Sequence, residues 1–143
     1  MTDSRGLSTK GWWINHADKV LDELECRETW VEGITDDDEQ SVFRIRQNIT
    51  ITKVYHVPDE AYAPGAIYLV NRGTAGAVDS TVASHTAHST LTALAVQELT
   101  VDSDYSAIDA GEVLTFKRTT ASGDTVQKAG LVGIEYTIRN TGA

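Results

Sequence analysis

The stretch Ile108–Ile138, IDAGEVLTFKRTTASGDTVQKAGLVGIEYTI, decides the fold class of this 143-residue chain. It contains two apolar runs, Val113–Thr120 and Leu131–Ile138, with polar turn residues at Ala121–Asp124 between them. The second run places an apolar residue at every second position: Val132, Ile134, Tyr136 and Ile138. This period of two is typical of a strand with one buried face, as in antiparallel sheets. We therefore expect two β-strands joined by a polar turn.

Most of the chain upstream of this pair also has strand character. Short runs with strand-forming residues lie at Ser41–Arg46, Ile49–Val57, Ala66–Asn71, Val78–Ala83, Leu91–Val96 and Glu98–Val101. Within the second of these, Lys53 and Val54 fall out of phase, which indicates a bulge or a change of sheet. Seven or eight short strands separated by turn signals predict an all-β protein, specifically an antiparallel β-sandwich or jelly-roll-like fold.

The N-terminal third differs from this pattern. We predict an N-terminal arm with one short acidic α-helix over residues 1–45, followed by a β-sandwich domain over residues 46–143. Asn15 is a suitable helix cap, and the helix is expected to run to about Cys26. Its apolar stripe has the spacing i, i+3, i+4, i+7 and consists of Ala17, Val20, Leu21 and Leu24.

All three tryptophans precede the β-rich region, at Trp12, Trp13 and Trp30. Two explanations for the adjacent pair remain open. Trp12 and Trp13 either cap the core of their own domain or anchor the arm on a neighbouring subunit, because tryptophan is a typical interface anchor. We predict Trp12, Trp13 and Trp30 as partner-contact residues.

The charge of the chain is concentrated in one block. Residues 18–39 hold ten acids and two bases, which is −8 of the net −9. An acidic protein is poorly suited to nucleic acid, which requires a basic surface. The acidic block is either a solvated face or a contact for a basic partner. The sequence contains no apolar run of ~18 residues that could span a membrane, and its N-terminus lacks the apolar region of a secretory signal.

Residues that could bind a metal or take part in catalysis are scattered along the sequence. His85 and His88 would point to opposite faces of a strand, and no third metal ligand can be identified. Asp102 and Asp104 lack the spacing of a calcium loop and fit an Asx turn. The single cysteine, Cys26, is expected to act as a small hydrophobe on the helix. We find no catalytic motif and predict neither an enzyme nor a cofactor or metal site.

The closing strands resemble a known family. The phrases Leu99–Val101, Ile108–Phe116 and Ala129–Tyr136, with Pro64–Val70 and Asn71–Gly76 upstream, resemble small head decoration or cement proteins of tailed phages. Residues 1–45 carry no such resemblance.

This resemblance implies a role as a non-enzymatic virion structural protein. It implies a homotrimer that binds the major capsid protein and stabilises the capsid exterior, and that is present in the host cytoplasm during assembly. Two alternatives stay open, namely a phage tail or fibre domain and a carbohydrate-binding β-sandwich module.

Overall fold

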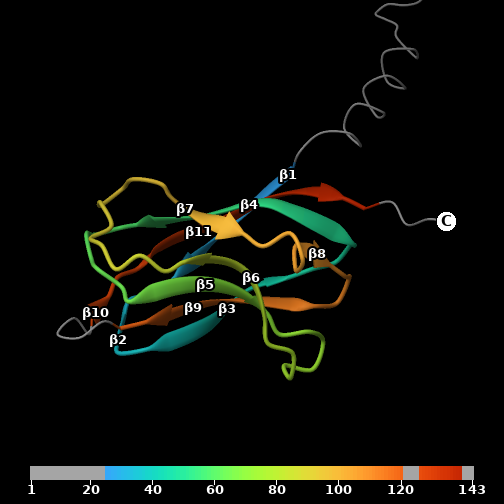
Figure 1. Ribbon diagram of the computed structural model, residues 1–143, viewed down its shortest axis with the longest axis horizontal. Coiled ribbons are helices and arrows are strands. Elements are labelled where there is room, and N and C mark those ends of the chain that lie inside the picture. The colour runs from blue at the N-terminus through green and yellow to red at the C-terminus, as the bar shows by residue number, and fades with distance from the viewer. Residues whose placement is uncertain (1–24, 121–125, 140–143) are drawn as a thin grey trace, which may run out of the picture.

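The computed structural model describes residues 25–120 and 126–139, and within these ranges the chain forms eleven β-strands and no helix (Figure 1). The strands are β1 (Glu25–Val31), β2 (Ile34–Thr35), β3 (Asp38–Arg44), β4 (Ile49–Pro58), β5 (Ala66–Asn71), β6 (Ser80–His85), β7 (Gln97–Val101), β8 (Ala107–Ile108), β9 (Val113–Thr119), β10 (Val126–Gln127) and β11 (Gly130–Ile138). Every strand pair is antiparallel. The prediction of an all-β antiparallel protein is confirmed.

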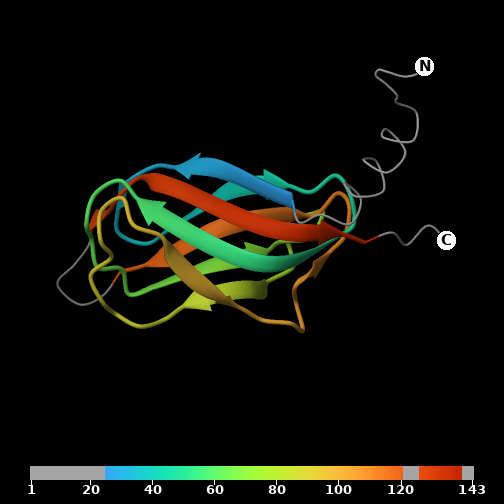
Figure 2. The same cartoon turned by 90° about the horizontal axis from the view of Figure 1, so that it is seen from above.

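Nine of the strands form one sheet that is nearly closed on itself (Figure 2). Its order is β1-β11-β4-β7-β6-β5-β9-β3, with β8 paired to β4, and β10 and β2 form a separate two-stranded sheet. The central strand β7 connects the two halves. Its first part pairs with β4 through Val54 and Leu99, and its end pairs with β6 through Ala83 and Val101. The sheet therefore curves around a single core.

Side chains join the two outermost strands, β1 and β3, where the sheet meets itself; we call this line the seam. The Gln40 amide lies beside Glu32, accepting from its backbone N–H at 3.0 Å and donating to its carbonyl at 3.1 Å. Arg27 donates to the Arg44 carbonyl at 3.3 Å and covers the ring of Phe43. Side chains of Gln40 and Arg27 thus join β1 to β3 in place of a ladder of backbone hydrogen bonds, and they lie along the unpaired edges of these two strands.

A bulge in β4 controls which side chains face the core. The register with β11 shifts at Thr52, so Ile51 before it and Val54 and His56 after it all point inward. Tyr55 consequently lies on the outer side of the sheet. Of the two explanations that the sequence left open, a bulge or a change of sheet, the structure shows the bulge. Continuous alternation of the sequence would place Tyr55 on the same face as Ile51, and the one inserted residue reverses this.

The core follows the alternation in the remaining strands. Buried apolar residues come from both halves of the sheet, and the largest of them are Phe43, Ile45, Ile51, Ile67, Leu69, Leu91, Leu99, Ile108, Leu114, Phe116 and Ile134. In β11, Val132, Ile134 and Tyr136 point inward, as predicted. Tertiary packing of these residues decides the fold.

Two expectations about element placement were wrong. The strands Val113–Thr119 and Gly130–Ile138 do not pair with each other, because β9 lies between β5 and β3 whereas β11 lies between β1 and β4. The turn predicted at 121–124 lies outside the described residues. The run Leu91–Val96 is not a strand: Leu91 makes a single bridge to Tyr62, and Leu94 has a positive φ of 63° that interrupts extended backbone.

The N-terminal prediction is tested only in part. The helix expected at residues 15–26 lies mostly outside the described residues, but its last two positions, Glu25 and Cys26, belong to β1, so it does not extend to Cys26. Although the apolar residues before them have helical spacing, Glu25 and Cys26 pair with β11. Residues 25–44 contribute β1 and β3 to the main sheet, so the expected boundary at residue 45 falls within the folded body.

Candidate interaction surface

The most completely bonded group in the interior is the guanidinium of Arg118, on β9. Its Nε and Nη2 atoms each donate to Asp38 at 3.1 Å, and Asp38 is itself almost fully buried. The other N–H groups donate to the hydroxyl of Tyr62 and to the carbonyls of Lys128 and Glu32. All five donors of the guanidinium are therefore satisfied, and this side chain of β9 joins β3 to the residue that follows β1 and to the connection between β10 and β11.

Tyr62 extends this buried network to His56. The His56 Nδ1 lies 2.9 Å from the Leu131 carbonyl, which can only accept, so Nδ1 carries the proton. Nε2 then accepts from the Tyr62 hydroxyl at 2.7 Å. Burial lowers the pKa of His56 to about 4, and the charge of Arg118 acts in the same direction. His56 is neutral at physiological pH and serves the packing of the interior.

Three acids at the end of the acidic block, Asp37, Asp38 and Glu39, have partners within the chain. Asp37 accepts from the backbone N–H of Thr120 at 2.7 Å, and Asp38 is paired as described above. Glu39 accepts two bonds from Arg72, at 2.6 and 2.7 Å, which lower the pKa of Glu39 to about 2. Acids that already have partners are poor candidates for an external basic partner or a cation.

The outer side of β1, β11 and β4 carries an uncovered row of apolar side chains. Trp30 pairs with Leu131, Leu131 pairs with Val57, and Val96 lines the same hollow as Val57 just before β7. We call these four residues the apolar row. Trp30 is 49% exposed and Val96 67% exposed, whereas Leu131 and Val57 are partly exposed. Such a contiguous exposed row is typical of a contact surface.

Tyr55 forms the rigid neighbour of this row. Its ring lies across Gly133, where any Cβ would overlap the ring atoms. Its hydroxyl donates to Glu28 and lies 3.4 Å from the Cys26 sulfur. Burial, followed by the bonds to Cys26 and Glu28, raises the pKa of Tyr55. Cys26 is thus an exposed residue of the outer face and not the helical hydrophobe expected from the sequence.

A shallow hollow of about 310 Å³ lies between Tyr55 and the apolar row. Its lining includes Glu28, Glu135 and Lys53 in addition to Tyr55, Val57 and Val96. Glu98 pairs with Tyr55 across the β4–β7 ladder and is exposed on the same side. The outer face therefore combines an apolar centre with three carboxylates and one ammonium.

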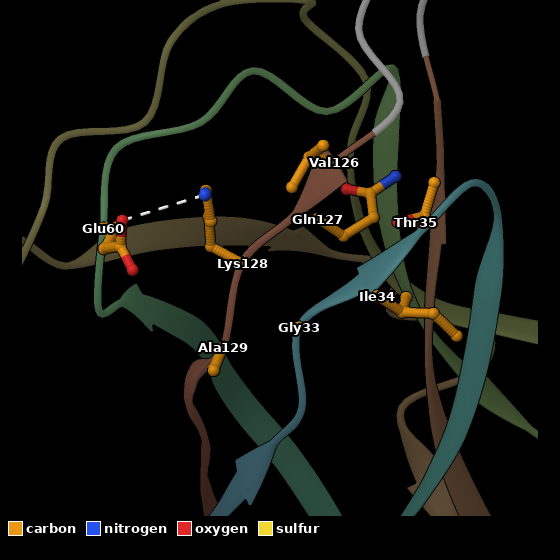
Figure 3. Close-up of a pocket in the computed structure, with 8 residues that line it drawn as sticks. All are labelled: Gly33, Ile34, Thr35, Glu60, Val126, Gln127, Lys128 and Ala129. Carbon is orange, nitrogen blue, oxygen red and sulfur yellow. Dashed lines mark ion pairs between the residues drawn. The ribbon is translucent and has the colours of Figure 1, made fainter.

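A second hollow, of about 350 Å³, lies beside the small β2–β10 sheet (Figure 3). In Figure 3, Lys128 points toward Glu60, and their charged atoms are 3.7 Å apart. Gln127 also lines this hollow; it is buried, and its Oε1 has no hydrogen-bond partner among the described residues.

The remaining residues considered from sequence do not form a site. His88 bonds the Pro64 carbonyl at 2.8 Å and His85 lies 3.4 Å from Gln97, so the two histidines do not converge. Asp102 accepts from the Asp104 backbone at 2.9 Å, the Asx turn predicted there. Among residues 25–120 and 126–139 no cluster of histidine, cysteine and acidic side chains is arranged to hold a metal. The same residues contain no helix able to cross a membrane.

Of the three predicted contact residues, the structure describes only Trp30. Trp30 lies on the apolar row, while Trp12 and Trp13 lie outside the described residues. Sequence reasoning missed Arg118 and His56, although the sequence does carry a signal for Arg118. Arg118 continues the buried phase of Leu114 and Phe116 on β9, so a charged residue stands at a core position.

Comparison with known proteins gives no match to any family model, curated protein or solved structure.

Proposed function

We propose that this protein is a non-enzymatic structural protein of a tailed-phage virion. In this proposal it decorates and stabilises the capsid exterior, binding the major capsid protein and neighbouring copies as a homotrimer. Its body is then a β-sandwich of the jelly-roll kind. The support is the resemblance of Leu99–Tyr136 to decoration proteins together with an antiparallel β body that exposes a row of apolar side chains.

The observation that carries the proposal is the exposed apolar row. Trp30 presents half of its surface to solvent from a strand whose position is fixed on both sides, by the ladder to β11 and by the seam to β3. A large aromatic side chain on a rigid support is the usual anchor of a protein interface. The buried side chains of Arg118 and His56 are paired in the interior, whereas the apolar row is exposed to a partner.

The test is co-sedimentation with empty heads of the source phage, with the mass of the free protein measured by light scattering. We expect a trimer that pellets with heads, and we expect Trp30→Ser to lose this binding. Val78→Ser is the matched control, because Val78 is 44% exposed but lies in the connection from β5 to β6. The proposal would be contradicted by a protein that does not bind heads, or by Trp30→Ser and Val78→Ser variants that bind heads equally well.

A second candidate function has one specific observation in its favour. Trp30 lies two residues along β1 from Glu28, whose carboxylate accepts from the Tyr55 hydroxyl on the outer face. An aromatic platform beside polar groups suits the apolar and hydroxyl surfaces of a sugar, so a carbohydrate-binding module or a fibre domain that binds a receptor glycan fits the same face. Trp30-dependent binding on a glycan array, without binding to heads, would favour this alternative.

A further inference from the structure

The charges around the apolar row restrict what can cover it. Glu28, Glu98 and Glu135 lie on this face, and Lys53 is the base beside them among the described residues. Two copies packed through this face would bring like charges together, which is unfavourable in a partly desolvated contact. The row is therefore suited to a segment that carries large apolar side chains together with basic ones.

The chain contains such a segment immediately upstream of β1. Residues 1–13 include Trp12 and Trp13, the bases Arg5 and Lys10, and the single acid Asp3. This composition complements the outer face in both respects. The two tryptophans match the apolar row and its hollow, and the two bases match the carboxylates.

The attachment point places this segment within reach of the face. Eleven residues separate Trp13 from Glu25, the first residue of β1. An extended chain of this length spans up to roughly 40 Å, whereas Glu25 and Trp30 are about 17 Å apart along the strand. A segment tethered this closely acts at an effective concentration on the order of mM, which favours its own body over a neighbour in dilute solution.

We propose that residues 1–13 fold back onto the outer face of the same chain, with a tryptophan packed on the apolar row. In this arrangement the segment, which we call the strap, covers Trp30. The inference rests on the face and the segment and is independent of the capsid role.

The chain supplies its own probe for a direct test. Cys26 is the only cysteine, is exposed, and lies on the outer face. A nitroxide attached to Cys26 in the full-length ¹⁵N-enriched protein broadens nearby indole N–H signals, of which there are three. Trp30 is four residues along β1 and serves as the internal positive control. We expect the signals of Trp12 and Trp13 to lose intensity as well, and to recover when the label is reduced.

One mixture and one control decide the geometry. When labelled protein without ¹⁵N is mixed with unlabelled ¹⁵N protein, docking within one chain gives no loss of intensity. Loss in this mixture would mean that the segment binds a neighbouring copy and would overturn the proposal. A Cys26→Ser variant labelled at Asp79→Cys, in the connection from β5 to β6, should leave Trp12 and Trp13 unaffected.

A second measurement avoids any disturbance by the label. In the unlabelled protein, combined Trp12→Ser and Trp13→Ser should accelerate the reaction of Cys26 with a soluble thiol reagent, because the strap no longer covers the face. Val78→Ser should leave this rate unchanged. Undiminished Trp12 and Trp13 signals in the labelled protein, together with an unchanged thiol rate in the double variant, would show that the segment does not dock.

Discussion

The buried network around Arg118 encloses a charged group, whereas the outer face around Trp30 exposes an apolar one. At Arg118 a full charge is enclosed, and every donor of the guanidinium has an acceptor. At Trp30 an aromatic ring remains half exposed with no covering group among the described residues. Both arrangements run against the general preference for charge outside and aromatic surface inside.

The difference separates structural from functional residues. A buried ion pair with complete bonding fixes the relative positions of the strands that it joins, and removing either partner leaves an isolated charge. An exposed aromatic residue contributes little to folding and has value only in a contact. Residues of the first kind should therefore affect stability, and residues of the second kind should affect binding.

The largest effect on stability should come from Asp38→Ala. The substitution leaves the Arg118 charge buried without its carboxylate, at a cost of about 3–5 kcal/mol in the free energy of unfolding. Asp109→Ala is the matched control, because Arg139 and Asp109 form an exposed pair of the same chemistry. Its cost should be about 1 kcal/mol or less. Urea denaturation measures both, and equal losses would remove the distinction drawn here.

Acid should lower the free energy of unfolding in two steps. His56 has a pKa near 4 in the fold and an ordinary value of 6.5 when unfolded, so its contribution is complete above about pH 6.5. As the pH falls from 6.5 to 4, only the unfolded chain takes up this proton, and stability drops by on the order of 3 kcal/mol. Below about pH 4.5 the loss of the Glu39–Arg72 pair continues the decline toward pH 2.

Two substitutions separate these steps in denaturation measured across the pH range. Gln at position 56 can donate to the Leu131 carbonyl and accept from Tyr62 without titrating, so His56→Gln should abolish the upper step alone. Glu39→Gln should reduce the lower step and retain the upper one. A wild-type protein whose stability is constant between about pH 6.5 and pH 4 would contradict the neutral assignment of His56.

A smaller effect should come from Gly133→Ala, on the outer face. The added methyl group overlaps the Tyr55 ring, so the ring must leave its position, at a cost of about 1–3 kcal/mol. In a Tyr55→Ala background the same substitution should be close to neutral, because the space is then free. A double-mutant cycle of unfolding free energies measures the coupling, and an equal cost in both backgrounds would show that Tyr55 does not cover Gly133.

Local periodicity was sufficient for many of the strands and for the bulge. Ala66–Asn71 and the start of Val113–Thr119 were predicted at their observed positions, since apolar alternation and turn residues are local properties. The pairing of strands was not accessible in the same way. β9 and β11 are close in sequence yet belong to different halves of the sheet, because their partners come from residues far along the chain.

The candidate surface was only partly foreseeable. Tryptophan content identified Trp30 as a contact residue to be tested, but its exposure depends on which side of β1 faces β3 and the core. The acidic run illustrates the converse. Asp37, Asp38 and Glu39 look like a solvated turn in the sequence, and only the folded chain brings Thr120, Arg118 and Arg72 to them.

The single inserted residue at Thr52 has a consequence for how such a surface is kept. Upstream of it the inward positions are Ile49 and Ile51, and downstream they are Val54 and His56. Loss of one codon at this position would restore the regular alternation, with Val54 and His56 still inward and Tyr55 and Val57 still outside. The bulge therefore lets β4 carry one additional residue without exchanging its two sides, so a single insertion in an ancestral gene at this point leaves both the outer face and the core of the barrel-like body in place.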